Sequence, residues 1–496
     1  MSVLSPYYFA FVAALWLVAL PLRSARVRQV LLLLSSYLFY AVWGLDFLAI
    51  LIGSSLVNYA YGSFLRRRPT AARLWVGVLI NLSILSIFKY LPLLAEIAPP
   101  VSGIAHSLHR IVMPIGVSFW TFQALSYLFD LYREEEIKPS LMEFLLYMAF
   151  WPTVLSGPVC RLPQMLPQFR QASSVKWEDV KVGARRILIG LTMKAVLAQL
   201  LEAGLQPGEG VAAGFDQVKT GWGGFDVWIL AIGFAFQLYF DFGGYSNIVI
   251  GTARLFGIQL QENFDRPYLS TSPSVFWTRW HMSLSFWIRD YLFLPLAMLG
   301  RQRWWRHLAL VISMVLFGIW HKGSVLFVLW GSYHGILLVM HRQLQELGRR
   351  FKFILPGPLE TGVSWGMTFA SVSLGWILFR ANDLKQASSM LGAVFLPSSY
   401  HHLTLAPNFY RLVLVVAGVY FVVFSGIKDW MDRLNKIWEE PQVAKRRFGF
   451  AGDSVSFLWI NRLWWTTPMV IVFFFFGMLV ILQQNSTVAP FIYTLF

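Results

Sequence analysis

The chain has 496 residues, of which 57% are hydrophobic, 17% aromatic and only 13% charged. Soluble domains carry about 25% charged residues, so this composition excludes an ordinary water-soluble fold and predicts a membrane protein. The formal net charge is +16, but the basic residues lie in short clusters between apolar runs, which argues against nucleic-acid binding and for loops beside anionic lipid.

Apolar runs near helix-spanning length recur along the whole chain and predict an all-α polytopic integral membrane protein. The first run lacks the basic start of a signal peptide, so we expect it to be a retained helix. Some runs are shorter than the ~20 residues of a full span, so tilted or half-spanning helices are expected. We predict one membrane domain over 1–496. The runs are 5–22, 29–44, 46–62, 74–97, 111–131, 141–156, 185–205, 226–257, 306–321, 324–340, 363–379, 408–426 and 467–484.

The basic clusters predict the orientation of the chain. Arg23–Arg28, Arg66–Arg68 and Arg133 with Lys138 follow the first, third and fifth runs, while the turns between them lack Lys and Arg. By the positive-inside rule the basic loops are cytoplasmic, so the N-terminus and the C-terminus are predicted on the outer, periplasmic side. A surface helix is expected in the cytoplasmic loop at about 428–447.

Residues 271–296 combine aromatic and charged side chains. At 100° per residue their aromatic residues share one helical face and their polar residues form a stripe beside it. This pattern predicts a single helix that lies at the interface or lines a wet cavity.

His321 is the first candidate functional residue. It follows thirteen residues without an ionisable side chain, and basic clusters flank the two runs that surround it. The pattern predicts a helical hairpin with His321 at the far turn, about 22 Å from the cytoplasmic end. Ionisable groups at such depth are costly and mark functional sites. The alternatives are a histidine that only hydrogen-bonds between helices or one that reaches the outer headgroups.

A neutral imidazole at this position can act as a general base toward a hydroxyl group. The single cysteine, Cys160, excludes an internal disulfide and makes a thioester relay an unfavourable route. His281, His321, His334 and Asp241 could supply metal ligands, but they lack the tight spacing of a metal motif, so no metal is predicted.

Two further intramembrane groups leave alternatives open. His334 lies in GSYHG, whose glycines permit close helix approach, so it is either a packed or a catalytic histidine. Asp241 lies in QLYFDFGGYSN and is expected to pair with a basic residue or a histidine, and a helix break at Gly243–Gly244 is expected to open a cavity.

At these residues the chain resembles the membrane-bound O-acyltransferase (MBOAT) family, and it looks most like the bacterial branch that includes the membrane subunit of alginate O-acetylation. The resemblance covers about residues 1–385. It rests on LLLLSSYLFYAVWGLDFLAIL, MPIGVSFWTFQALSYLFDLYR, LSGPVCR, QLYFDFGGYSNIVIG, ENFDRPYLS, FWTRWHMSLSFWIRDYLF, FGIWHKGS, LWGSYHG and GWILFRA, in this order.

The resemblance implies a bundle with a transmembrane tunnel, with His321 as the catalytic base and His281 as the second histidine. It implies acetyl-CoA or an acyl-carrier thioester as the donor, no permanently bound cofactor, and a location in the bacterial inner membrane. It also implies acetylation of an extracellular or cell-wall polysaccharide, together with a periplasmic esterase-like partner protein. Candidate tunnel or donor-binding residues are Tyr239, Asp241, Asn263, Arg279, Trp280, Trp320, Lys322 and His334.

This chain departs from the branch at two positions. The branch has Gly after the catalytic His, where this chain has Lys322, and it has Asp where this chain has Asn247. Lys322 adds a cation that binds an anionic acceptor group or points to headgroups. Both departures bear on which acceptor the protein uses more than on which reaction it catalyses. The alternative functions are O-acylation of a lipid or protein hydroxyl and, in a different class, export of a polysaccharide or lipid-linked sugar.

Overall fold

The computed structural model describes residues 2–92, 112–133, 136–171, 175–206, 208–216, 221–351 and 357–438. Within these ranges the regular structure is helical, and one isolated bridge joins Phe264 to Trp280. The chain divides into two compact units, Met1–Ala417 and Gly418–Phe496. The single domain over 1–496 stays a prediction, and the run at 467–484 lies outside the described residues.

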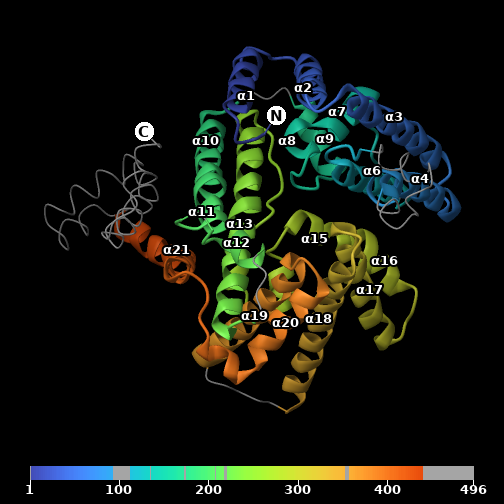
Figure 1. The fold of residues 1–496 in the computed structure, drawn as a ribbon. Coiled ribbons are helices and arrows are strands. Elements are labelled where there is room, and N and C mark those ends of the chain that lie inside the picture. The colour runs from blue at the N-terminus through green and yellow to red at the C-terminus, as the bar shows by residue number, and fades with distance from the viewer. Residues whose placement is uncertain are drawn as a thin grey trace, which may run out of the picture. The chain divides into compact units, whose positions relative to one another are not determined.

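The N-terminal part of the first unit consists of helices that follow the apolar runs closely (Figure 1). Serine and threonine side chains cap α1, α2, α4 and α7 by accepting a hydrogen bond from the first turn. These helices are α1 (Pro6–Ala19), α2 (Ala25–Ala41), α3 (Leu45–Arg67), α4 (Ala71–Lys89), α6 (Val117–Tyr132), α7 (Leu141–Ala149), α8 (Trp151–Val154) and α9 (Leu162–Arg170).

Among the remaining helices, the long helix α13 packs against α10, α19 and α20. The remaining helices are α10 (Trp177–Leu191), the π-helix Thr192–Ala198, α11 (Gln199–Ala203), α12 (Val211–Asp216), α13 (Gly224–Leu255), α14 (Pro273–Trp277), α15 (Met282–Ile288), α16 (Leu294–Met298), α17 (Arg303–His321), α18 (Val325–Phe351), α19 (Gly357–Arg380), α20 (Leu384–Phe395) and α21 (Pro407–Trp438). Short 3-10 turns occupy Pro267–Leu269 and Pro397–His401, and a second π-helix occupies Arg289–Phe293.

The predicted hairpin around His321 is present. Helix α17 ends at His321, three residues form the turn, and α18 returns along α17 (Figure 1). A Cβ added at Gly331 would overlap the carbonyl oxygen of Met314, and one added at Gly318 would overlap the carbonyl oxygen of Phe327. The two backbones are therefore in direct contact, which confirms that the glycines beside His334 permit close helix approach.

The break predicted at Gly243–Gly244 is wrong, because α13 runs without interruption from Gly224 to Leu255. A Cβ at Gly244 would come within 2.7 Å of the backbone nitrogen of Lys194. The glycines therefore let the π-helix at Thr192–Ala198 pack against α13, and packing rather than a cavity explains their presence.

The single helix predicted over 271–296 is also wrong. The segment is divided into α14, α15, the π-helix and α16, and the first interruption spans Thr278 to His281, whose φ of 42° lies in the left-handed region. The backbone N–H of Met282 donates to the carbonyl of Asn263 at 2.9 Å, so a contact from outside the segment turns the chain here.

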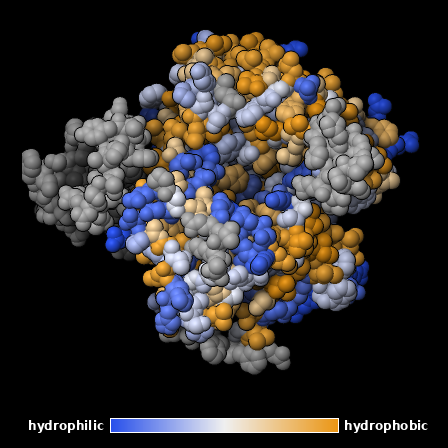
Figure 2. Space-filling model, viewed as in Figure 1, coloured by the Kyte–Doolittle hydropathy of each residue, from blue (hydrophilic) through white to orange (hydrophobic). Residues whose placement is uncertain are grey.

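The outer surface of the first unit is rich in apolar side chains (Figure 2). Within the described residues five helices are long and apolar enough to cross a membrane: α3, α4, α13, α18 and α19. Lipid tails solvate such side chains directly. The exposed ones include Leu34, Leu38, Trp75, Leu79, Ile336 and Met340. The predicted all-α, multi-pass membrane fold is confirmed. The surface helix predicted at 428–447 falls partly in α21, and its part beyond Trp438 lies outside the described residues.

We predict that Gly331→Ala destabilises the protein by about 1–3 kcal/mol, because the new methyl group must push α17 and α18 apart. Unfolding can be followed in detergent with a thiol-reactive fluorogenic dye, since the single cysteine, Cys160, is buried. Gly366→Ala on α19 is the control, because a Cβ there meets nothing within 4 Å. Equal melting temperatures for the two variants would contradict the close contact.

Candidate active site

His321 stands at the end of α17 inside a group of aromatic rings. Its ring centroid lies 4.7 Å from that of Phe317, 4.6 Å from Trp320 and 5.3 Å from Phe379. Trp330 meets it edge-on at 5.5 Å. The imidazole remains partly exposed, and among the described residues no side chain or backbone group hydrogen-bonds to its nitrogens. A ring held in this way by packing can offer a nitrogen lone pair to a bound molecule.

The C-terminal turn of α17 is held by the end of α4. The ammonium of Lys89 donates a hydrogen bond to the carbonyl of Trp320 and lies 4.7 Å from the centroid of the Trp320 ring. The hydroxyl of Tyr90 donates to the carbonyl of Ile319 at 3.2 Å. These bonds satisfy carbonyls that the end of a helix leaves free. Two residues of α4 therefore fix the position of the turn that carries His321.

Lys89 and Tyr90 were not among the residues predicted from the sequence. The signal that could have identified Lys89 is its position as the only basic residue in the apolar run 74–97. An isolated cation in such a run must find an internal partner. The sequence pattern does not identify this partner, because the Trp320 carbonyl is 231 residues away from Lys89.

His281 is buried, with 3% of its surface exposed, and lies in a network of hydrogen bonds. Its Nδ1 is 3.4 Å from Oδ1 of Asn263, which also accepts a 2.6 Å hydrogen bond from the hydroxyl of Ser283. The amide of Asn263 donates to Ser246 of α13 at 3.1 Å, and the backbone N–H of Val159 donates to Ser283 at 2.9 Å. Asn263 therefore joins four segments that are distant in the sequence.

The left-handed backbone at His281 results from this network. Asn263 hydrogen-bonds through its side chain and its carbonyl, and the Phe264–Trp280 bridge holds the two chain segments together. Left-handed φ angles in residues other than glycine are uncommon and cluster at functional sites. The fold thus constrains the direction of the His281 ring.

A second anchor follows His281 at the other end of α15. The carboxylate of Asp290 pairs with Arg161 and with Arg289, both at 2.7 Å. Burial raises the pKa of Asp290, but the hydrogen bonds from the two guanidinium groups outweigh burial, so the pKa lies below its usual value. The loop with Val159 and Arg161 therefore bonds to residues at both ends of α15. Val159 contacts Ser283 at its start, and Arg161 pairs with Asp290 just after its end.

The structure brings the two predicted histidines together. His281 and Lys89 both lie close enough to His321 to act on its charge electrostatically. The rings of Trp277 and Phe317 bridge the two segments, with centroids 5.6 Å apart. Both histidines thus lie in one candidate site, built from α17, the turn before α15 and the end of α4.

The other predicted residues make the following contacts. Trp280 and Tyr239 are buried and pack on Phe264, with centroids at 5.0 Å and 5.7 Å. Trp320 lies beside His321, and their rings are tilted by 58° to each other. Arg279 contributes its backbone carbonyl, which accepts from the N–H of Asp265 at 3.0 Å.

Asp241 pairs with Lys194, as its position inside an apolar run suggested. Asn247, at the position of a family Asp, accepts a 3.4 Å hydrogen bond from Arg186, whose charge is balanced by Glu262.

His334 is fully buried beside Trp330. Its ring packs edge-on against Trp330 at 5.0 Å and Trp277 at 5.2 Å, and both of its nitrogens lack a hydrogen-bond partner in the structure. Within the described ranges no three His, Cys, Asp or Glu side chains form a group that could hold a metal ion. The choice between a packed and a catalytic His334 stays open.

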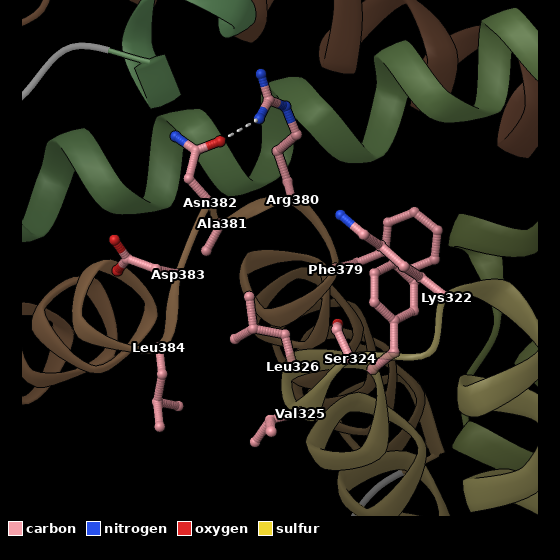
Figure 3. Close-up of a pocket in the computed structure, with 11 residues that line it drawn as sticks. Lys322, Ser324, Val325, Leu326, Phe379, Arg380, Ala381, Asn382, Asp383 and Leu384 are labelled. Carbon is pink, nitrogen blue, oxygen red and sulfur yellow. Dashed lines mark hydrogen bonds between the residues drawn. The ribbon is translucent and has the colours of Figure 1, made fainter. Parts of the chain in front are cut away.

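A pocket of about 480 Å³ opens beside His321 (Figure 3). Phe327 and Phe379 line it and also contact the His321 ring, at 6.1 Å and 5.3 Å between centroids. Two aromatic side chains therefore separate the pocket from the imidazole. The other lining residues are Lys322, Ser324, Val325, Leu326, Arg380, Ala381, Asn382, Asp383 and Leu384.

Comparison with known proteins places these residues in a family context. The family model described as MBOAT, membrane-bound O-acyltransferase family, matches residues 54–378, and a model for a family of unknown function (DUF5989) matches residues 448–496. The probable alginate O-acetylase AlgI of Pseudomonas syringae pv. tomato is 34% identical over 75% of this chain and 71% of its own length.

Two further relatives have other named activities. The peptidoglycan O-acetyltransferase of Helicobacter pylori is 30% identical over 73% of this chain and 72% of its own length. The teichoic acid D-alanyltransferase of Streptococcus thermophilus is 30% identical over 74% of this chain and 86% of its own length.

We predict that Lys89→Met destabilises the protein by about 1–3 kcal/mol, because the Trp320 carbonyl loses its donor in an apolar setting. Lys89→Arg should retain most of the stability, since it keeps a charged donor. Thermal unfolding with the Cys160 dye measures both, and Lys181→Met, at an exposed surface pair, is the control. A Lys89→Met protein as stable as the control would rule out the anchoring role.

Ser283→Ala should cost about 2–4 kcal/mol, because it leaves the Val159 N–H without its acceptor and removes a donor to Asn263. Labelling of Cys160, next to Val159 in the chain, should also become faster below the melting temperature. Ser388→Ala removes an exposed hydroxyl on α20 and should change neither value. If both variants behave alike, the network does not hold this loop.

Proposed function

The chain belongs to the membrane-bound O-acyltransferase family and is a membrane O-acyltransferase, and on that premise we propose that it transfers acetyl from a cytoplasmic thioester across the membrane for O-acetylation of an extracellular or cell-wall polysaccharide. The observation that carries the proposal is the imidazole of His321. It is partly exposed, fixed by aromatic rings, without a hydrogen-bond partner among the described residues, and close to a second histidine.

His321 acts as the general base. Its neutral imidazole takes the proton of a hydroxyl group while the hydroxyl oxygen attacks the thioester carbonyl. The carbon–oxygen bond forms, the carbon–sulfur bond breaks, and the imidazolium returns the proton to the leaving thiolate. A base in this role needs a free lone pair, and the environment of His321 provides one.

His281 supports this step by orienting the donor or by assisting proton transfer. When Nδ1 carries the proton, its contact with Asn263 leaves the lone pair on Nε2. The network around Asn263 keeps the ring from turning. Candidate residues for the path of the donor are Tyr239, Asp241, Arg279, Trp280 and Trp320.

The surroundings of His321 favour a short acyl group. Phe317, Trp330 and Phe327 are each at least nine-tenths buried and occupy the space around the imidazole. A long acyl chain would have to displace these rings, and close-packed interiors resist such displacement. Acetyl, bound to coenzyme A or to an acyl carrier, needs little space.

The named relatives support a polysaccharide acceptor outside the cell. They act on alginate, peptidoglycan and teichoic acid by name. The positive-inside pattern supports an orientation with the basic loops in the cytoplasm of a bacterial inner membrane and the His321 turn toward the other face. A periplasmic esterase-like protein is the partner we propose for the final transfer to sugar.

The test is turnover of radiolabelled acetyl-CoA by the purified full-length chain in lipid nanodiscs, with and without polysaccharide acceptors. His321→Ala should lower thioester turnover by about 10²–10⁴-fold, because it removes the general base. His281→Ala should lower it by a smaller factor. His401→Ala, an exposed histidine, is the control for folding and handling.

Equal turnover by wild type and His321→Ala would remove His321 from the mechanism. D-alanyl and longer acyl thioesters, offered in parallel, test the acyl group. Faster turnover of a long-chain thioester than of acetyl-CoA would contradict the proposed acyl size.

A further inference from the structure

We propose that the end of the α17–α18 hairpin opposite His321 binds the phosphodiester headgroup of an anionic phospholipid, held by the guanidinium groups of Arg306 and Arg342. The site lies at the other end of α17 from the proposed base, where the helix begins. Its ligand is a structural lipid, neither donor nor acceptor of the acyl group. The inference therefore goes beyond the proposed function and does not depend on it.

Two arginines from different helices meet at this end of the hairpin. The side-chain amide of Gln343 on α18 lies 3.3 Å from Nδ1 of His307 on α17. Arg306 and Arg342 each precede one of these residues in the chain, and their charges are close enough to act on each other. Arg342 is half-buried, and its guanidinium lies 5.8 Å from the centroid of the Phe293 ring. The aromatic ring therefore restricts this cation before any ligand binds.

The charge of this cluster is not balanced within the described part of the chain. Arg303 pairs with Glu346, but Arg306 and Arg342 form neither an ion pair nor a side-chain hydrogen bond with any described residue. Neighbouring like charges repel each other, and the repulsion grows where protein and lipid lower the effective dielectric constant. An anion bound by both guanidinium groups offsets this cost.

Another pair of arginines shows how the protein balances such a meeting elsewhere. Where Arg161 and Arg289 meet, the carboxylate of Asp290 pairs with both of them at 2.7 Å. No side chain in the described ranges has this role for Arg306 and Arg342. A phosphodiester carries the same single charge as a carboxylate, and its oxygens accept the paired hydrogen bonds that guanidinium groups donate. The ligand chemistry that fits the cluster is therefore a phosphate ester.

The apolar side chains around the cluster favour a lipid over a soluble phosphate. Trp304, two residues before Arg306, is 61% exposed, and tryptophan is enriched at the level of the lipid headgroups. Leu308 on α17 and Ile336 and Met340 on α18 are also exposed, on the His321 side of the arginines. Lipid tails solvate such side chains directly. The cations thus stand at headgroup level beside a surface for acyl chains.

A basic cluster at a helix end can also be a solvated group that only records the orientation of the chain. Arg67 and Arg68 at the end of α3 are of this kind, because both are exposed and both belong to one helix end. In the proposed site the cations come from two helices, and one of them is held against an aromatic ring. Basic pockets between membrane helices are known to hold anionic headgroups. We therefore expect saturable binding of one lipid here and only diffuse attraction at α3.

The experiment is native mass spectrometry of the full-length chain with dioleoyl phosphatidylglycerol and dioleoyl phosphatidylcholine offered at equal concentrations. We expect the wild type to retain one phosphatidylglycerol in preference to phosphatidylcholine. Arg306→Gln/Arg342→Gln should bind phosphatidylglycerol about tenfold more weakly, because it removes two charged donors to phosphate. The matched control, Arg67→Gln/Arg68→Gln, removes the same charge from the other cluster and should bind like the wild type.

Thermal unfolding gives a second readout that separates binding from folding. A ligand that binds only the native state raises its stability, so phosphatidylglycerol should raise the melting temperature of the wild type and of the α3 control above that in phosphatidylcholine. The double variant at the proposed site should gain less. Arg306→Gln alone changes an exposed side chain without an internal partner among the described residues, and it should fold and lose part of the gain.

Equal loss of binding in the two double variants would overturn the inference, because the preference would then reflect net charge alone. Equal retention of the two lipids by the wild type would overturn it as well. Glycerol 3-phosphate in excess tests a soluble phosphate as the ligand, and displacement of the bound lipid by it would contradict a lipid site. None of these readouts requires thioester turnover, so their failure leaves the proposed function in place.

Discussion

The structure depends on one constraint: polar groups inside an apolar bundle must find partners within the protein, because neither lipid nor packed side chains can hydrogen-bond to them. The carbonyl of Trp320 at the end of α17 finds the ammonium of Lys89. The side chain of Asn58 on α3 finds that of Asn81 on α4, which bonds back to it. The imidazoles of His321 and His334 both lack a hydrogen-bond partner among the described residues, but His334 is fully buried, whereas His321 is partly exposed and can meet a bound molecule.

The same constraint explains the architecture around His281. Asn263 places both ends of its amide in hydrogen bonds, and these bonds connect α13, the loop with Val159 and the start of α15. A buried polar network that is fully paired specifies one arrangement, because each alternative leaves a group unpaired. The unusual backbone at His281 is stable for that reason, and the direction of its ring follows from the network.

Aromatic packing and close glycine contacts complete the site. Gly318 and Gly331 bring α17 and α18 into backbone contact, which sets the position of the turn that follows His321. Trp330 contacts both His321 and His334. The large rings leave little free space at the imidazole, while the wider pocket lies one ring away, at Lys322.

The apolar helices and the hairpin that carries His321 followed from the sequence, because hydrophobic length and the cost of burying an ionisable group are local properties. The family motifs added His281 and Asn263. Only the tertiary structure decided that α13 continues through Gly243, that the chain turns at His281, and that Lys89 and Ser283 belong to the site. Each of these depends on a partner far away in the sequence, such as Asn263 for Met282 or Trp320 for Lys89. Helical periodicity reports which residues share a face, but not which distant group will supply a hydrogen bond to it.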